Sequence, residues 1–313
     1  MTRFGLQLPN FTLGVPDDQL FDRVVELAVT GEESGFSSLW VMDHLYQLPA
    51  LGGAGQPMLE GYTLLGGLAA RTSRAELGTL VTGVTYRNPA LVAKIITTLD
   101  VISRGRAVLG IGAAWHDIEH VGLGFEFPPA KERLDRLEEA VQICRAMFTE
   151  EAPSFEGRYY RIEEARNLPR PLRPGGPPIL IGGGGERRTL RLVAQYADRC
   201  NVSGDLDTVR HKLDVLRQHC ADVGRDPADI MTTRLGSLFF ADSAAQADET
   251  RSMLTGLAGA EFVDGCTIGT EDQIVDQVAA ILGAGIQEPI FNLPFADPEV
   301  VGRVGKLLTS QFA

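Results

Sequence analysis

Long apolar runs and paired cysteines are both missing from this chain of 313 residues. No apolar run reaches the ~18 residues that a transmembrane helix needs, so we expect no membrane span. The four cysteines are scattered without a CxxC pair, and single thiols within apolar patterns are typical of core residues in a reducing compartment. The first residues show no signal-peptide pattern. Together these features predict a cytoplasmic protein.

Basic residues are also scarce, because 29 Lys and Arg face 41 Asp and Glu and the formal net charge is -12. An acidic field repels polyphosphates at long range, which argues against nucleic acid or an anionic membrane as a partner. An anionic ligand would therefore need a local site. The remaining composition, with 44% hydrophobic and 22% charged residues, is typical of a globular protein and excludes a disordered one. We expect a small-molecule partner.

Short β-rich apolar runs alternate with segments whose apolar residues recur every three or four positions. Apolar runs of this kind are typical of parallel strands buried on both faces. Eight β-α units in a chain of this length favour an α/β fold of the closed (β/α)8 TIM-barrel type over a doubly wound sheet. We predict one domain over residues 1–313, with insertions at about 45–62 and 150–178 at the C-terminal face of the strands. The predicted strands are 4–8, 39–42, 77–81, 107–111, 179–181, 200–202, 232–240 and 289–293.

Barrel active sites lie where strands end, and two candidate groups follow predicted strands. Asp43 and His44 come directly after the second strand, where a carboxylate beside an imidazole can carry protons near neutral pH. The alternative is a histidine that only caps the strand. Gly182–Gly185 precede a helical pattern, and such a bare turn lets a phosphate approach free backbone N–H groups. Arg187 and Arg188 could add positive charge there; the alternative is a plain flexible turn.

Two further motifs are weaker. Gly110-Ile-Gly112-Ala-Ala-Trp115 lacks the third glycine of a dinucleotide fingerprint, but its bare backbone suits a planar ring. His116-Asp-Ile-Glu-His120 matches a zinc-peptidase pattern. That chemistry needs a long helix and a third ligand, whereas glycines flank this stretch. We therefore favour a polar helical turn with solvated histidines and predict no metal. No serine or cysteine nucleophile with a partnered base is visible, which argues against acyl-transfer hydrolysis.

Taken in order along the chain, these segments resemble the bacterial-luciferase-like superfamily, and specifically its coenzyme F420-dependent oxidoreductases. The resemblance runs essentially from end to end. It rests on residues 4–10, 38–44, 77–83, 87–89, 98–115, 132–138 and the glycine run that starts at Gly182. The resemblance implies a TIM barrel that binds a deazaflavin ring at its mouth, and homodimers are common in the family.

Carried over position by position, the resemblance assigns two groups of residues. Asp43 and His44 would lie beside the reactive ring edge, where His44 hydrogen-bonds or exchanges protons. The third strand of such enzymes ends in a non-prolyl cis peptide behind the ring, here at Leu80–Val81. The implied cofactor-binding residues are Leu80, Val81, Thr82, Gly112, Ala113 and Trp115 around the ring, and Gly182, Gly183, Gly184 and Gly185 at the phosphate of the tail.

The resulting hypothesis is an oxidoreductase that moves a hydride between F420 and a small organic substrate with a C=C, C=O or C=N bond. The cofactor carries the redox step and the barrel supplies placement. Trp115 and the apolar residues of the first insertion favour a hydrophobic substrate. One alternative is a luciferase-like monooxygenase that uses reduced FMN and oxygen. Another is a non-catalytic barrel that only binds or carries a cofactor.

Overall fold

The computed structural model describes residues 2–312, and its central feature is a closed barrel of parallel strands. Each strand pairs with the next around the ring, and β12 pairs with β1 to close it. The predicted TIM barrel is therefore confirmed. The eight barrel strands are β1 (Gly5–Leu8), β2 (Ser38–Val41), β3 (Glu76–Thr79), β5 (Ala107–Gly112), β8 (Ile179–Gly182), β9 (Arg199–Val202), β10 (Met231–Phe240) and β12 (Glu288–Asn292).

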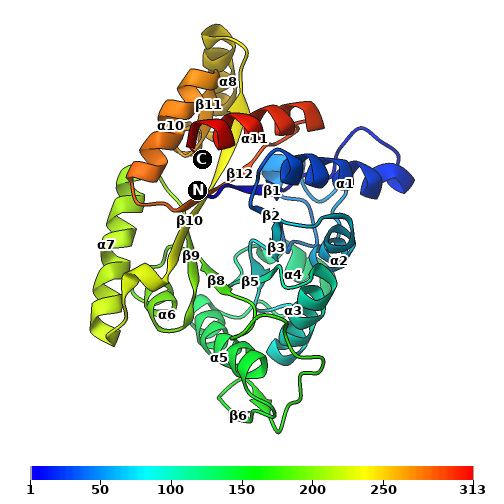
Figure 1. The fold of residues 1–313 in the computed structure, drawn as a ribbon, viewed down its shortest axis with the longest axis vertical. Coiled ribbons are helices and arrows are strands. Elements are labelled where there is room, and N and C mark those ends of the chain that lie inside the picture. Colours follow the sequence, from blue (N-terminus) through cyan, green and yellow to red (C-terminus); the bar gives the residue numbers. More distant parts are fainter. Residues whose placement is uncertain (1, 313) are drawn as a thin grey trace.

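Helices surround this ring, as Figure 1 shows from one end of the barrel. The three- and four-residue spacing explains their packing, because α1 buries Leu20, Val24 and Leu27 against the strands. Asn88 caps the start of α3, and its side chain accepts a hydrogen bond from the Ala90 N–H. The surrounding helices are α1 (Asp17–Glu33), α2 (Gly61–Arg71), α3 (Pro89–Ser103), α5 (Ala130–Thr149), α6 (Thr189–Tyr196), α7 (Leu206–Val223), α10 (Glu271–Gly283) and α11 (Pro298–Phe312).

The inside of the barrel is filled by side chains. Trp40, Val108, Leu180 and Ile290 are completely buried there. Gly78 makes room for the indole, because a Cβ at Gly78 would lie 2.8 Å from the ring of Trp40. A packed interior leaves no channel through the barrel, so a ligand site must lie at one end.

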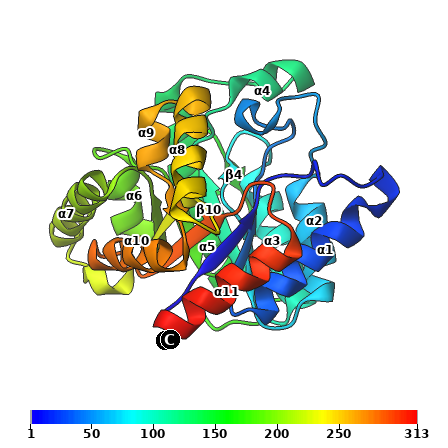
Figure 2. The same cartoon turned by 90° about the horizontal axis from the view of Figure 1, so that it is seen from above.

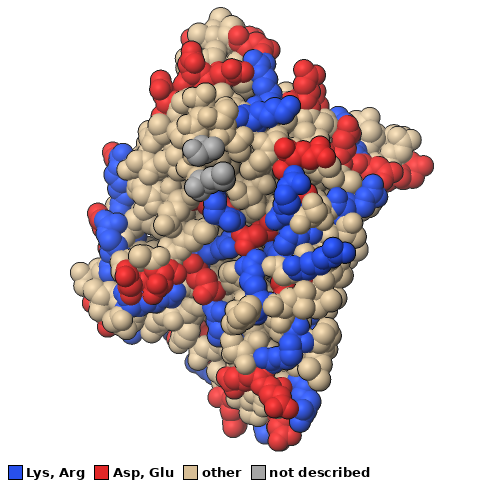
Figure 3. All heavy atoms as spheres, in the orientation of Figure 1, with Lys and Arg blue, Asp and Glu red and all other residues tan. Residues whose placement is uncertain are grey.

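Charged side chains close the end at which the strands begin. Glu76 at the start of β3 pairs with Arg3, Arg173 and Arg199, and Arg199 also approaches Glu288. Burial alone would raise the pKa of Glu76, but the surrounding guanidinium groups, Arg199 first, lower it to about 2. Acidic and basic side chains are interspersed over this end of the molecule (Figure 3). We call this group, Arg3, Glu76, Arg173, Arg199 and Glu288, the basal ion cluster.

The two predicted insertions lie at opposite ends of the barrel. Residues 45–60 follow β2 and include a short 3-10 helix, η1 (Pro49–Leu51), at the C-terminal ends of the strands. Residues 150–178 instead connect the end of α5 to the start of β8. Arg173 in this connection contacts Gly105 and Glu76 at the basal end. This corrects the expectation that both insertions lie at the C-terminal face, because a helix-to-strand connection necessarily returns to the start of the next strand.

Several smaller elements complete the chain. Within the 150–178 connection, β6 (Phe155–Glu156) and β7 (Arg161–Ile162) pair antiparallel and form a hairpin. One strand was not predicted: β11 (Thr267–Gly269) pairs with the C-terminal end of β10, beyond the barrel rim. Figure 2 shows α4 with α8 and α9 at the end opposite the C-terminus. The remaining elements are β4 (Thr82–Gly83), α4 (Asp117–Leu123), α8 (Ala244–Ala258), α9 (Ala260–Asp264) and η2 (Pro227–Asp229).

Within residues 2–312, no helix has both the length and the apolar character needed to cross a bilayer. Three of the cysteines, Cys144, Cys200 and Cys220, are buried as predicted, and Cys266 is half-buried. Burial raises the pKa of the Cys144 and Cys200 thiols to about 12, so both are inert protonated core groups.

Candidate active site

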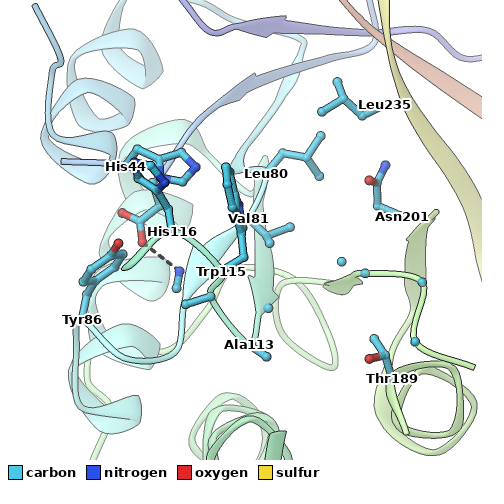
Figure 4. A pocket seen from close by; sticks show the side chains of 18 of the residues that line it. His44, Leu80, Val81, Tyr86, Ala113, Trp115, His116, Thr189, Asn201 and Leu235 are labelled. Atoms are coloured by element: carbon cyan, nitrogen blue, oxygen red, sulfur yellow. Dashed lines mark hydrogen bonds between the residues drawn. The ribbon is translucent and has the colours of Figure 1, made fainter. Parts of the chain in front are cut away.

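A cavity of about 360 Å³ opens at the C-terminal ends of the strands. Figure 4 shows His44 and Thr189 toward opposite ends of this pocket, with Val81 and Trp115 between them. The pocket brings together every residue assigned to the site from the sequence except Thr82. Its lining consists of Asp43, His44, Leu80, Val81, Gly83, Tyr86, Gly112, Ala113, Ala114, Trp115, His116, Glu119, Gly182, Gly183, Gly184, Gly185, Thr189, Asn201 and Leu235.

Thr82, which was expected to contact the cofactor, is not among the residues that line the pocket. Its side chain is completely buried, and its hydroxyl is hydrogen-bonded to Tyr62 at 2.5 Å and to Thr79 at 2.6 Å. Gly83, the next residue, lines the pocket instead. Successive residues of an extended segment face opposite sides, so an error of one position exchanges a wall residue for a core residue.

His44 is held by a buried carboxylate that the sequence analysis did not assign to the site. Its Nδ1 lies 2.7 Å from Glu119 Oε1. Glu119 also accepts hydrogen bonds from the backbone N–H groups of Leu45 and Tyr46 and from the Tyr86 hydroxyl. Burial acts to raise the pKa of Glu119, but the bonds from His44, Tyr86 and the backbone lower it to about 2. Glu119 is therefore ionised at neutral pH.

An ionised acceptor fixes the tautomer of the imidazole. The Nδ1–H of His44 donates a hydrogen bond to Glu119, so Nε2 is the ring nitrogen whose lone pair is left to accept a proton. The imidazole also lies edge-on to Trp115 and to His116, with ring centroids 5.5 and 5.6 Å apart. These contacts hold the ring in one orientation at the end of the pocket.

Glu119 belongs to the stretch that matches the zinc-peptidase pattern, and the structure gives that stretch a different meaning. His116 and His120 are buried rather than solvated, which corrects the favoured interpretation of this turn. Both ring nitrogens of His120 are in use, Nδ1 with the carbonyl of His116 and Nε2 with Thr85. Among the described residues no group of three or more His, Cys, Asp or Glu side chains is placed to hold a metal. The pattern that contains Glu119 was therefore noticed in the sequence, but it was considered only as a possible zinc site.

Asp43 lies behind His44 in a network of its own. Its Oδ2 accepts hydrogen bonds from Arg87 at 2.8 Å and from the Gly83 N–H at 3.1 Å, whereas its buried Oδ1 has no partner among the described residues. Burial raises the pKa of Asp43 to about 6, with Arg87 opposing the shift. Asp43 therefore anchors the loop that carries His44 and contributes a carboxyl group that titrates in the acidic range.

The floor of the pocket is almost bare backbone. The peptide between Leu80 and Val81 is cis, as the family resemblance predicts. A Cβ at Gly112 or at Gly182 would lie 2.8 Å from the Val81 side chain, so only glycine lets the neighbouring strands close around it. Trp115, whose side chain is largely exposed, rises beside this floor. The result is a flat surface suited to a planar ring.

The glycine run leads away from this floor toward α6. Gly183 has a φ of 123°, which disfavours other residues, and its N–H bonds to the carbonyl of Asn201. Arg188 was expected to add positive charge at this loop, but its side chain is paired elsewhere. Its guanidinium instead lies 2.6 Å from Asp135 on α5. The helical pattern was expected to start at Glu186, but α6 begins at Thr189, so both arginines precede the helix.

The chain matches a known protein family over most of its length. A family model described as luciferase-like monooxygenase matches residues 2–263. The chain belongs to this family.

The luciferase-like chain also has named relatives. It is 34% identical to an F420-dependent glucose-6-phosphate dehydrogenase of Kineococcus radiotolerans over 72% of this chain and 66% of the relative. The matched region thus spans just under two thirds of that relative. Two solved structures share the fold. The F420-dependent tetrahydromethanopterin reductase of Methanopyrus kandleri has a TM-score of 0.81 at 17% identity, covering 100% of this chain and 99% of that one. Monooxygenase RslO1 of Streptomyces bottropensis has 0.81 at 21%, covering 99% and 98%.

Proposed function

We propose that this protein is a coenzyme F420-dependent oxidoreductase that transfers a hydride to or from a small, predominantly hydrophobic organic molecule. The observation that carries the proposal is the pairing of two features in one pocket. A proton-carrying imidazole, His44, lies at one end, and a flat glycine floor leads from it to a phosphate-sized turn at the other. The 34% identical relative named for F420 supports the choice of cofactor.

The residues present fit a ring with a long anionic tail. The bare backbone at Gly112 and Gly182 leaves space against the Val81 side chain that a Cβ would fill. Gly183–Gly185 lead out of the pocket beside the start of α6, where backbone N–H groups suit a phosphate. When bound, F420 supplies a two-electron hydride transfer, and the protein supplies position and electrostatics.

The chain's own contribution to the chemistry is the management of one proton. Reduction of a C=O, C=N or C=C bond by a hydride requires a proton at the second atom of that bond. His44 Nε2 is placed to deliver that proton, or to remove it in the reverse direction. Glu119, ionised and bonded to Nδ1, stabilises the imidazolium and keeps Nε2 directed at the pocket.

The apolar surroundings support a hydrophobic substrate. Leu80, Leu235 and the exposed Trp115 line the same pocket as His44, and no lysine or arginine is among the residues that line it. A substrate with its own phosphate would find no lysine or arginine among the residues that line the His44 end of the pocket. We therefore propose a small carbonyl, imine, alkene or alcohol rather than a sugar phosphate.

The test is a binding titration with F420 and FMN side by side, followed by a turnover screen with the cofactor that binds. We expect F420 to bind and to be reduced or oxidised in the presence of small hydrophobic alcohols or carbonyl compounds. Binding of FMN without measurable affinity for F420 would instead favour the monooxygenase alternative, which the family description keeps open. Reduced FMN reacts with oxygen, so oxygen consumption separates the two outcomes.

We further propose that the protein is a cytoplasmic homodimer. The free thiols suit a reducing compartment. Ile118 and Val121 on α4 and Leu257 on α8 are exposed apolar side chains of the kind that subunit contacts cover. Light scattering after size-exclusion chromatography tests the dimer, since a mass near 33.8 kDa would show a monomer.

A further inference from the structure

One lysine in this acidic chain is placed against the glycine turn without a carboxylate partner. Lys212 lies on α7, and its Nζ packs so closely on Gly184 that a Cβ at that position would collide with it. The ammonium group donates one hydrogen bond, to the carbonyl of Ser203 at 3.0 Å. It has no ion pair within 4.0 Å among the described residues, and the nearby Glu186 approaches His211 instead.

Other donors at the same spot also lack acceptors. Thr189, at the start of α6, is only 7% exposed, and its hydroxyl makes no hydrogen bond with the described residues. That oxygen lies 2.9 Å from the Cβ position of Gly185, so it faces the turn. The backbone N–H groups of Gly184 and Gly185 bond to no carbonyl within residues 2–312. A buried hydroxyl and two free N–H groups without an acceptor thus lie beside an ammonium group that has an acceptor for only one of its three protons.

We propose that Lys212 and Thr189, together with Gly184 and Gly185, form the site that binds the phosphate of the cofactor tail. This inference rests on the proposed function and names its anion-binding side chains. A phosphate oxygen accepts from each donor without displacing an internal bond, and the ammonium balances its charge in a chain of net charge -12. Glycine at 184 is needed because the lysine must cross directly over the backbone.

The distance from the reacting end gives this site its function. Thr189 lies at the other end of the pocket from His44 (Figure 4). A charge held there fixes the position of the ring along the pocket without contacting the reacting atoms. Lys212 is therefore a positioning residue, and its loss weakens binding of any ligand that has the phosphate and spares ligands that lack it.

The experiment compares two ligands with one reacting ring, F420 and the deazariboflavin that lacks the phosphate-containing tail. Dissociation constants are measured by fluorescence titration for the wild type, Lys212→Gln, Thr189→Val and Lys306→Gln. Lys306 is an exposed lysine on α11 and serves as the matched control. We expect Lys212→Gln to weaken F420 binding by about 10-fold or more and Thr189→Val by a few-fold. The tail-less ligand should bind all four proteins equally.

Gly184→Ala provides a second route to the same result, because the added methyl group displaces the lysine while leaving its charge in the chain. We expect it to weaken F420 binding and to leave the tail-less ligand unaffected. F420 binding that is equal in the wild type and in Lys212→Gln overturns the tail site but leaves the proposed function standing. Binding of FMN and not of F420 overturns the proposed function, and the same variants titrated with FMN and riboflavin then decide the tail site.

Discussion

The two ends of this barrel use buried carboxylates in opposite ways. At the basal end, Glu76 is surrounded by guanidinium groups, which keep their charge at any physiological pH. At the mouth, Glu119 binds a titratable imidazole, a phenol and backbone N–H groups. Both carboxylates have a pKa near 2, yet only the second is connected to a group that can change its proton content. The lesson is that the partner, and not the carboxylate, separates a structural ion cluster from a reactive site.

The largest expected effect is a loss of turnover from a substitution at the mouth of the barrel, with the basal ion cluster unchanged. His44→Ala removes the proton carrier, and we expect kcat to fall by about 10²–10⁴-fold, the usual value of general acid–base catalysis. The free energy of unfolding should change little by comparison. Steady-state kinetics with a urea titration of the same protein checks both. Unchanged turnover across the accepted substrates would contradict the role of His44.

The second expected effect is a loss of stability from a substitution in the basal ion cluster, with the pocket at the mouth unchanged. Glu76→Gln leaves the buried Arg199 without its main counter-ion, and we expect a loss of about 3–5 kcal/mol in the free energy of unfolding. Affinity for the cofactor should persist in the folded fraction. Glu163→Gln is the control, because that side chain is 77% exposed and its pairing contributes little. Equal losses in the two variants would show that the basal ion cluster does not stabilise the barrel.

The third effect compares the two ends by pH. Each carboxylate has a folded pKa of about 2, below the ordinary 4.5, so its stabilising contribution is complete above about 4.5 and is lost as the pH falls toward 2. We expect roughly 3 kcal/mol from each. Asp43 acts in the opposite sense. Because its pKa is raised to about 6 in the folded protein, the free energy of unfolding should decrease as the pH rises from about 4 to 6.

Urea titrations between pH 2 and 7 measure this dependence. Glu76→Gln and Glu119→Gln should each flatten the loss of stability below pH 4.5, and Asp43→Asn should flatten the opposing change between about pH 4 and 6. Of the two glutamate variants, only Glu119→Gln should also alter the pH profile of turnover, because Glu119 contacts His44 and Glu76 lies at the other end of the barrel. An altered profile in Glu76→Gln would show that the two ends are coupled.

The smallest effect concerns the exposed wall of the mouth. Trp115→Ala removes an aromatic surface that is 64% exposed, so we expect a change in unfolding free energy within about 0.5 kcal/mol. KM for hydrophobic substrates should rise several-fold, with kcat less affected. Kinetics on a series of substrates of increasing apolar size measures this, and an effect independent of substrate size would argue against contact with the substrate.

The barrel was predictable because the local spacing of apolar residues indicates both parallel strands and amphipathic helices. The same order along the chain placed Asp43, His44 and the glycines at one face, since every strand of such a barrel ends there. β11 escaped prediction because it pairs only with an extension of β10 outside the barrel, and its three residues carry no period of their own.

What the sequence could not predict depends on contacts between distant segments. Glu119 is 75 residues from His44, and the local pattern around it indicated a metal site rather than a hydrogen bond to that histidine. Arg188 looked available beside the glycine turn, but Asp135 on another helix binds it. Lys212 approaches the same turn from α7. In each case the chemistry of a side chain is set by a partner that only the closed barrel brings near.

The side chains packed around Trp40 close the inner end of the pocket, so it opens only at the mouth of the barrel. Whatever enters by the mouth must leave by it, and a ring lying on the glycine floor would block the path of any molecule beneath it. Order of addition is then a matter of geometry: the larger ligand goes in first and the smaller one comes and goes above it. Product-inhibition kinetics of this protein should accordingly show an ordered sequence rather than a random one.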